Sequence, residues 1–455
     1  MKKKIILLST LVLLIFLNLY SLSRLSLTRE NLRKPEHYLK LPPGNYLRVI
    51  SFGNKELMGD LLLSRALTYY GSHYYQRKYK YPYLFDFFKN VCEVDSLNLQ
   101  AYLMGGRLLS DKYPHKAIKI LIKGEKILDN SWKIPELTGF IYYYNVKDRY
   151  LAAKYYEKAS QKPEHPPYVP SLSSKFYSEG GNIEDAIKVL YSFYKTTKDK
   201  RLKKSFKNDI ENLSAELSLR RRWHRGKVER VIDGDSLIIR TERGTLKEAR
   251  IIGINSYELN SNIEINRIYG RIAKDYAYYT LNQKNIHFTI GGDGIDRYGR
   301  ILIYLWYDNT KLYNEEILKR GFAKAFLRYN FNKIMKRRFR EAEKLAKINM
   351  RGIWGLKYLK PLENIEYATG LIGDVAKVRF TVHNVYRGRK YIYLNSSADY
   401  RHCFKLIIPL KFKSNFYPEV IYLKGKRVEA FGFVSEYRGI PEIRLYERSQ
   451  IKVIK

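Results

Sequence analysis

The chain has 455 residues, of which 45% are hydrophobic, and it carries a formal net charge of +39 at pH 7. This length exceeds what one hydrophobic core can serve, so we expect two to four domains. The charge indicates a polyanionic partner, either nucleic acid or an anionic membrane surface, with a merely lysine-rich solvated surface as the alternative. The only cysteines, Cys92 and Cys403, fall in different expected domains, which argues against a structural disulfide.

The first residues have the pattern of a membrane segment. Three lysines follow Met1 and precede an uncharged, apolar run from Ile5 to Ser23. Such a run is long enough to span a bilayer as a helix, and lysines before it favour a cytoplasmic amino end with the bulk of the chain outside. We therefore predict a membrane anchor over residues 1–28. A cleaved signal peptide, with secretion after cleavage, is the alternative.

Residues 45–219 are expected to form a helical domain. Three related segments follow one another at offsets of 35 and 34 residues: Ala117-Ile-Lys-Ile-Leu121, Ala152-Ala-Lys-Tyr-Tyr156 and Ala186-Ile-Lys-Val-Leu190. This period resembles that of tetratricopeptide repeats, helix–turn–helix units in which a small Ala lets two helices approach. The resemblance implies a protein-binding array, and an irregular helical bundle is the alternative.

Two basic stretches come next, Lys200-Arg-Leu-Lys-Lys204 and Arg220-Arg-Arg-Trp-His-Arg225. They are either parts of a solvated linker or a patch that follows a nucleic-acid backbone. From Gly226 to about Leu356, short β-rich segments precede helices. Five strands with late helices suit a small Greek-key barrel of the OB type. The predicted strands are Lys227–Val231, Ser236–Thr241, Ala249–Ile254, Asn285–Ile290 and Ile301–Leu305; the predicted helices are Tyr269–Leu281, Tyr313–Arg320 and Lys333–Asn349.

Three short motifs in this region carry the chemistry. They are Val231-Ile-Asp-Gly-Asp-Ser236, Arg250-Ile-Ile-Gly-Ile-Asn-Ser-Tyr-Glu258 and Asp296-Arg-Tyr-Gly-Arg300. The three motifs lie within a segment of about seventy residues, and together they contribute several carboxylates and the arginines Arg250 and Arg300. Those side chains can hold a divalent metal ion, grip a phosphodiester and activate water.

In this order and spacing the three motifs resemble the thermonuclease, or staphylococcal nuclease-like, family. Further matches are Tyr269-Gly-Arg-Ile-Ala273, Gly321-Phe-Ala-Lys324 and Gly352-Ile-Trp354. No one motif is specific, since Asp-Gly-Asp-Ser alone is a common turn, but all six together are. The resemblance covers residues 222–358 and implies a phosphodiesterase on an OB-type barrel.

The resemblance also implies a set of calcium ligands. Asp235 matches the family's metal-binding aspartate, whereas the second metal carboxylate falls at Asn255 and the carbonyl ligand at Ser256. An amide oxygen still coordinates calcium, but one negative charge is lost, so affinity or ion preference is expected to change. We interpret Asp233 as forming the turn or supporting the ligands from behind.

For catalysis, Glu258 matches the family's general base, or at least the residue that orders the attacking water. Arg250 and Arg300 match the two arginines that hold the scissile phosphate. Tyr298 is a candidate nucleotide contact, and Tyr329 matches one of the family's later tyrosines. The equivalent of another such tyrosine is Leu327, so base stacking is expected to be weaker or supplied elsewhere.

Residues 365–455 are again β-rich, with strands predicted at Val375–Val385, Tyr391–Leu394, Cys403–Ile408, Arg427–Val434 and Glu442–Tyr446. They resemble a second OB-fold module of the nucleic-acid-binding sort, although OB folds also bind proteins or act as spacers. Cations and aromatic side chains are expected to form a groove for single strands. They are Arg387, Arg389, Lys390, Tyr391, Tyr393 and Phe404.

The sequence thus predicts a multidomain α+β protein with a membrane helix, an all-α repeat array, an OB-type nuclease barrel with C-terminal helices, and a second small barrel. The predicted function is a calcium-dependent nuclease of single-stranded or frayed DNA or RNA, tethered outside the cytoplasmic membrane, with a protein partner for the array. Calcium is expected as one ion, with other divalent metals as alternatives. The competing hypothesis is a non-catalytic nucleic-acid or protein scaffold with a degenerate nuclease domain.

Overall fold

The computed structural model describes residues 42–75, 80–308, 310–416 and 419–454. The predicted anchor over residues 1–28 lies outside these ranges. Within them, no helix combines the length and the apolar character needed to cross a bilayer. The chain divides into two compact units, Met1–Phe176 and Tyr177–Lys455. Each is considered by itself.

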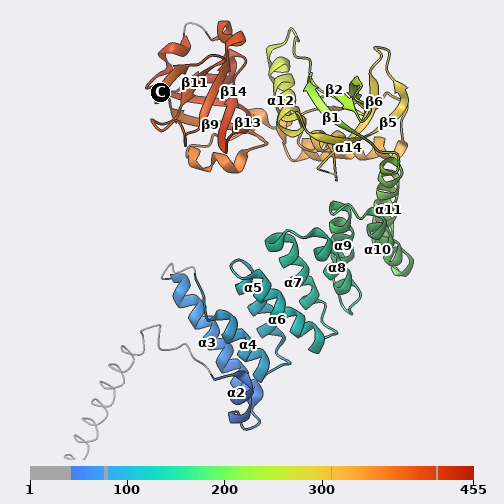
Figure 1. Cartoon of the computed structure of the whole chain (residues 1–455), viewed down its shortest axis with the longest axis vertical. Helices are drawn as coiled ribbons and strands as arrows, with labels where there is room; N and C mark the ends of the chain where they lie inside the picture. The colour runs from blue at the N-terminus through green and yellow to red at the C-terminus, as the bar shows by residue number, and fades with distance from the viewer. Residues whose placement is uncertain (1–41, 76–79, 309, 417–418, 455) are drawn as a thin grey trace, which may run out of the picture. The chain divides into compact units, whose positions relative to one another are not determined.

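The first unit is helical, as the sequence predicted (Figure 1). Neighbouring helices pack in pairs, α3 with α4, α5 with α6 and α7 with α8. The helices are α2 (Gly44–Ile50), α3 (Lys55–Tyr75), α4 (Leu84–Val94), α5 (Leu99–Ser110), α6 (Pro114–Ile127), α7 (Lys133–Ile141), α8 (Arg149–Ser160) and α9 (Tyr168–Glu179), with a short π-helical turn, η2 (Tyr142–Val146), after α7.

The three repeated alanines have equivalent positions. Ala117, Ala152 and Ala186 each lie one turn into their helix, α6, α8 and α10, and each is fully buried. A residue without side-chain bulk at these points allows helices to approach closely. These positions agree with an internal repeat, and the assignment to tetratricopeptide repeats stays a prediction.

The second unit begins with α10 (Ile183–Thr196) and α11 (Lys200–Arg220), which pack on each other. Both basic stretches therefore belong to structured segments: Lys200–Lys204 begins α11, and Arg220–Arg225 leads from its end into the first strand. Ion pairs join α11 to α14 (Lys333–Ile348), since Arg338 of α14 bridges Glu216 and the buried Glu315.

A closed five-stranded barrel follows, with the neighbour order β1-β2-β3-β6-β5 and back to β1. All pairs are antiparallel except β3 with β6, which are parallel and close the barrel. The elements are β1 (His224–Val231), β2 (Ser236–Thr241), β3 (Leu246–Ile251), β4 (Ile254–Asn255), α12 (Glu264–Leu281), β5 (Asn285–Ile295), β6 (Ile301–Tyr307), β7 (Lys311–Leu312), α13 (Tyr313–Lys319), β8 (Lys324–Ala325) and α14 (Lys333–Ile348).

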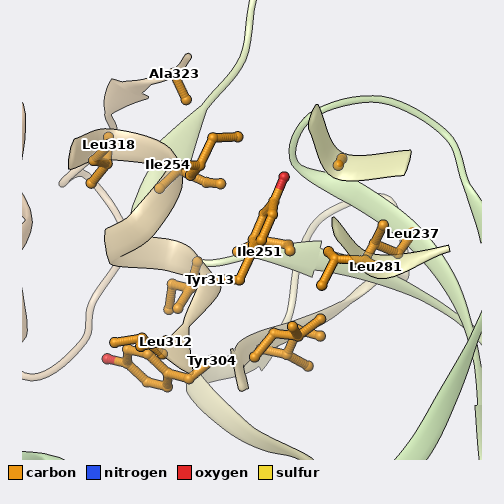
Figure 2. Packing of buried hydrophobic residues seen from close by; sticks show 14 of the residues in the cluster. Leu237, Ile251, Ile254, Leu281, Tyr304, Leu312, Tyr313, Leu318 and Ala323 are labelled. Carbon is orange, nitrogen blue, oxygen red and sulfur yellow. The ribbon is translucent and has the colours of Figure 1, made fainter. Parts of the chain in front are cut away.

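The predicted strands and helices of this region are present, with shifted ends. The segment predicted as one strand, Ala249–Ile254, is split: β3 ends at Ile251, and β4 pairs with β8 instead. Helix α12 begins at Glu264, more than a turn before the predicted Tyr269. The core of the barrel is formed by apolar side chains from strands and helices, as the packing of Leu237, Ile251, Leu281, Tyr304 and Tyr313 illustrates (Figure 2).

The C-terminal region has the same plan of strands. Around its sheet the neighbour order is β10-β11-β12-β14-β13, and β9 pairs with β13. Here β12 and β14 are the parallel pair. The strands are β9 (Val375–Thr381), β10 (Asn384–Arg387), β11 (Tyr391–Asn395), β12 (Lys405–Pro409), β13 (Arg427–Tyr437), β14 (Ile440–Arg444) and β15 (Ile451–Val453).

One predicted strand of this region, Val375–Val385, is divided into β9 and β10. The break has a simple cause, because the chain changes partner there: Val382 N donates to Lys426 O beside β13, and His383 N donates to Asn395 O on β11. Taken together, β9 and β10 correspond to β1 of the first barrel, which also pairs with two different strands. Nucleic-acid binding by this module stays a prediction.

Candidate active site

The turn between β1 and β2 holds the first group of candidate residues. Asp233 accepts a hydrogen bond from Asp235 N at 2.9 Å through Oδ1, a contact that holds the turn together. Asp235 is buried, and its Oδ2 accepts from Ser256 N at 2.6 Å while its Oδ1 accepts from Ser236 Oγ at 3.0 Å. Two backbone segments therefore hold this carboxylate rigidly at the start of β2.

Two glycines of the matching motifs allow helix α12 to lie against this turn. A Cβ on Gly234 would come within 2.7 Å of Ala273 Cβ and 2.8 Å of Ser256 Cβ. A Cβ on Gly270 would come within 2.5 Å of Tyr257 O. Because only glycine fits at these two points, the helix can press the turn and the segment at Tyr257 together.

Arg250 lies at the centre of the site. It is on β3, only 6% of its surface is exposed, and its guanidinium forms an ion pair with Asp235. Its Nη2 also donates to Asn255 Oδ1 at 2.8 Å and to Ile254 O at 3.1 Å. Burial lowers the pKa of Arg250 from its ordinary value, and the neighbouring cation Arg300 adds to that effect.

Arg300 reaches the same point from the loop between β5 and β6. Its Nη1 donates to Ser236 Oγ at 3.2 Å, the hydroxyl that itself donates to Asp235. Asp296 holds the arginine through Nε and Nη2, at 2.9 and 2.8 Å, and accepts from Arg300 N and Tyr298 N with its other oxygen. Burial by itself raises the pKa of Asp296, but the hydrogen bonds from Arg300 bring it below its ordinary value.

The catalytic assignments can now be placed in space. The structure brings Asp235, Arg250, Asn255, Ser256 and Arg300 together around one turn. Glu258 lies two residues after Ser256 in the sequence and is exposed, so its carboxylate is open to water. Among the described residues, none forms a hydrogen bond or ion pair with that carboxylate.

The two candidate stacking tyrosines differ in environment. Tyr298 is 67% exposed, and the guanidinium carbons of Arg297 and Arg300 lie 4.8 and 5.2 Å from its ring centre. Tyr329 is half-buried against Phe326, with ring centres 5.3 Å apart. Tyr329 also lies near Arg250 and raises its pKa, which favours the charged form of the arginine.

The donor chemistry decides how well a metal ion fits. Within the described ranges, no three His, Cys, Asp or Glu side chains are grouped so that they could hold a metal. The implied ligand set has one carboxylate, Asp235, plus oxygens of Asn255 and Ser256. Oxygen donors suit a hard cation such as calcium, but affinity rises with ligand charge, and Arg250 already neutralises Asp235. The residues therefore fit a weakly held hard cation.

The candidate residues of the C-terminal module lie on the β10–β11 hairpin. Tyr393 pairs with Tyr386 across the two strands, with ring centres 6.0 Å apart, and its ring lies 6.1 Å from that of Tyr391. Tyr391 and Tyr393 are half-buried, while the hairpin cations are exposed. These cations are Arg387, Arg389 and Lys390.

Phe404 is a correction. It was expected to line the groove with these tyrosines, but only 3% of it is exposed and its ring packs on Phe380 at 5.9 Å in the core of the C-terminal barrel. The residue directly precedes β12, where side chains alternate between the two faces of the sheet. The sequence did not show which face Phe404 occupies.

Sequence reasoning gave no role to several residues that build the site. Ser236 joins Asp235 to Arg300, and Asp296 holds Arg300. The buried Tyr313 hydroxyl donates to Gly234 O at 2.9 Å and thereby supports the turn from α13. Ser236 and Asp296 were inside the quoted motifs, so the motifs contained the signal. Tyr313 had no such signal in the sequence, since it lies in an ordinary helical pattern.

A cavity elsewhere on the barrel is separate from this chemistry. It has a volume of about 460 Å³ and lies at the opposite end of β1 and β2 from the turn. Its lining includes Arg225, Lys227, Arg240 and His287. None of the residues that surround Asp235 contributes to it.

Two arginines anchored beside an acidic turn at one end of a five-stranded barrel define a phosphodiester-binding protein of the nuclease class. Comparison with known proteins agrees. A family model described as Staphylococcal nuclease homologue matches residues 248–355. This span includes Arg250, Glu258 and Arg300, while the turn with Asp235 lies just before it.

Individual relatives extend the match. A thermonuclease of Staphylococcus hyicus is 33% identical over 130 residues, which are 28% of this chain and 74% of that protein. A thermonuclease of Staphylococcus intermedius is 30% identical over 128 residues, again 28% and 74% of the two chains. The SPbeta prophage-derived endonuclease YokF of Bacillus subtilis is 27% identical over 128 residues, 28% of this chain and 43% of that one. Through this domain, the chain belongs to the staphylococcal nuclease family.

Proposed function

We propose that the chain is a calcium-dependent nuclease that hydrolyses phosphodiester bonds of single-stranded or frayed DNA or RNA. The observation that carries the proposal is the convergence of Arg250, from β3, and Arg300, from the β5–β6 loop, on the Asp235–Ser236 corner. Two planar guanidinium groups at one point suit the oxygens of a single phosphate, since each can donate two parallel hydrogen bonds.

Each side chain has a distinct part in the proposed reaction. Arg300 is held by Asp296 and needs no rearrangement to receive a phosphate oxygen. Arg250 gives up part of its contact with Asp235 and binds the phosphate instead. Its guanidinium then neutralises negative charge that builds up at phosphorus. The exposed Glu258 orders a water for in-line attack and accepts its proton. Because the grip is on phosphate, sequence preference is slight.

Asp235, Asn255 and the Ser256 carbonyl are the residues that would hold the cation. When bound, a calcium ion supplies positive charge to the phosphate oxygens and orders water. Its affinity is expected to be low, because only one ligand side chain is charged. A calcium-rich environment outside the membrane suits such a site, and it agrees with the predicted anchor over residues 1–28, which cell fractionation and protease accessibility test.

A second candidate function, a non-catalytic scaffold, is favoured by one feature. Asn255 has no negative charge, and the guanidinium of Arg250 occupies the carboxylate that a metal ion would need. A barrel that binds strands without cutting them would keep the arginines and lose metal binding. The retained Glu258 argues for catalysis, since a scaffold has no use for an exposed carboxylate that repels phosphate.

The test is digestion of a single-stranded oligonucleotide with calcium and with chelator. We expect cleavage by the full chain with calcium only, and loss of cleavage in Glu258→Gln and Arg300→Ala. Glu242→Gln is the matched control, because that exposed carboxylate lies at the far end of the barrel. Absence of cleavage by the unmodified chain at every calcium concentration, with strand binding intact, would identify the scaffold instead.

A further inference from the structure

The nuclease barrel and the C-terminal barrel are parts of one compact unit, and helix α12 lies between them (Figure 1). Phe433 of β13 packs on Tyr276 of α12 and on Phe322, with ring centres 6.1 and 6.0 Å away. A buried polar contact adds to this, because Tyr446 Oη donates to Asp275 Oδ1 at 2.6 Å. The second barrel is therefore held in a fixed position beside the nuclease site.

One face of α12 is turned toward the second barrel. Arg267, Arg271, Asp275 and Tyr278 follow one another at the three- and four-residue spacing of a helix face. Arg267 forms an ion pair with Glu447 at 2.7 Å. The guanidinium of Arg271 lies 4.8 Å from the Phe412 ring centre and 5.4 Å from that of Tyr446. Both barrels thus contribute to one continuous surface along this helix.

Within the described part of the chain, three cations on this surface form no direct ion pair, although Asp275, on the same helix as two of them, balances part of their charge. No carboxylate of the described residues lies within ion-pair distance of Arg271, Lys274 or Lys411. Lys274 Nζ donates to Ile232 O at 2.7 Å, in the turn that carries Asp235. Burial lowers the pKa of Lys274, and the like charges of Arg271 and Lys411 lower it further. Arg271 and Lys274 lie on one helix, and Lys411 precedes Phe412, whose ring contacts Arg271, so an anion bound here would reduce the repulsion among the three cations.

The surface continues to the tyrosines of the β10–β11 hairpin. Leu410, which precedes the exposed Lys411, donates its backbone N–H to Lys390 O at 3.0 Å. Tyr391 pairs with Pro409 in the neighbouring strand and is followed by Tyr393, whose ring lies 6.1 Å away. Cations next to half-exposed aromatic rings are the combination that binds single strands, with phosphates on the cations and bases on the rings.

We propose that one nucleic-acid strand runs from the catalytic turn across Arg271, Lys274 and Lys411 to Tyr391 and Tyr393, so that the second barrel forms a strand-binding extension of the nuclease site. The proposal rests on the proposed nuclease function for the direction of the strand, but not for its binding. A single strand is the occupant, because its bases are free to stack whereas a duplex hides them.

Binding is measured by fluorescence anisotropy on the full chain in chelator, with a labelled oligothymidylate of about 20 nucleotides, longer than one OB-type barrel covers. Lys411→Glu should weaken binding about tenfold and reduce the slope of log affinity against log salt by about one or more. Tyr391→Ala should weaken it about fivefold to a hundredfold.

Lys424→Glu is the matched control. Lys424 is also exposed on the C-terminal barrel, but it precedes the start of β13, whereas Phe433 near the other end of that strand contacts α12. Equal effects of Lys411→Glu and Lys424→Glu, or no effect of either, would overturn the proposal. So would undiminished binding by Tyr391→Ala, or equal competition by a heparin fragment, since both indicate a general polyanion surface.

The two proposals fail separately. If the full chain binds the oligothymidylate through Lys411 but never cleaves it with calcium, the nuclease function is wrong and the strand path stands. If the chain cleaves both oligothymidylate and dinucleotide while Lys411→Glu and Tyr391→Ala bind normally, the path is wrong and the nuclease function stands. Duplex binding as tight as single-strand binding also contradicts the path.

Discussion

The two barrels of the second unit share one order of strand pairings but differ in the chemistry of their loops. In the nuclease barrel, the turn after the first strand contains Asp233 and Asp235, and the loop before the last strand pairs Asp296 with Arg300. In the C-terminal barrel, the equivalent turn is Gly388-Arg-Lys390, and the equivalent loop carries Arg438. The first barrel therefore combines acids with arginines, and the second presents cations and tyrosines.

This contrast shows that the shared scaffold does not decide the chemistry. In the nuclease barrel the two loops meet at one end of the sheet, as the hydrogen bond from Arg300 to Ser236 shows. Hydrolysis needs carboxylates for water and metal as well as cations for phosphate. Binding a strand needs only cations and rings. A barrel whose loops carry acids and arginines is suited to cleaving a strand, whereas a barrel whose loops carry cations and tyrosines is suited to binding one.

The largest effect on the cleavage rate is expected for Arg300, and it should distinguish this arginine from Arg438 in the equivalent loop of the second barrel. Arg300→Ala should lower cleavage about a hundredfold to a thousandfold, or about 2.7–4 kcal/mol of transition-state stabilisation, because a donor aimed at the phosphate is lost. Arg438→Ala, at the equivalent loop of the second barrel, should leave the cleavage rate of a dinucleotide unchanged. Initial rates on a dinucleotide and unfolding temperatures check both. Equal loss in the two variants would contradict the division of roles.

A second prediction concerns the contact that joins the barrels. Burial raises the pKa of Asp275 from 3.8 to about 6, partly offset by Arg444 at 3.8 Å. The folded protein then binds more protons than the unfolded chain between these values. The contribution of Asp275 to stability is therefore greatest below about pH 4, falls as pH rises to about 6, and is constant above it, with a total loss of about 3 kcal/mol or less.

Urea unfolding of the full chain across this pH range measures the effect. Asp275→Asn should remove the pH dependence, because the amide oxygen still accepts from Tyr446 and no longer titrates. Glu436→Gln, at an exposed carboxylate of β13, is the control and should keep it. If the stability of the unmodified chain relative to Asp275→Asn instead rose between pH 4 and 6, ion pairing with Arg444 would outweigh burial.

A third prediction concerns a substitution that restores the missing negative charge among the proposed calcium ligands. Asn255→Asp should lower the calcium concentration for half-maximal cleavage about tenfold, because affinity follows the charge of the ligands. Calcium titration of the cleavage rate is the measurement. Asn285→Asp, which adds the same charge at the far cavity, should have no such effect. An unchanged calcium requirement in Asn255→Asp would remove Asn255 from the ligand set.

The smallest effect is expected in the hairpin of the second barrel. Arg389→Ala should weaken binding of an oligothymidylate about twofold to fivefold and lower the salt slope by about one, since an exposed cation contributes one phosphate contact. Dinucleotide cleavage should stay constant. Anisotropy titrations at several salt concentrations check this. A loss of dinucleotide cleavage in Arg389→Ala would place the hairpin inside the catalytic site.

Much of the fold was predictable, because strand and helix patterns depend on local sequence. Strand β2 has the predicted bounds, and α13 and α14 differ from their predictions by one residue. The errors are where pairing partners change: Ala249–Ile254 divides between β3 and β4, and Val375–Val385 divides between β9 and β10. A change of partner depends on residues far away in the chain, so no local pattern contains it.

By itself, the sequence determined which side chains are available for the chemistry, since Asp235, Arg250, Glu258 and Arg300 stand in motifs whose spacing is specific. Only the tertiary structure decided which of them meet: Ser236 links Asp235 to Arg300, and Tyr313 supports the turn from a helix many residues later. It also placed Phe404 in a core and Phe412, the neighbour of Lys411, against Arg271 of α12. The reason is physical, because closing a barrel brings together loops whose separation in sequence carries no information about their distance in space.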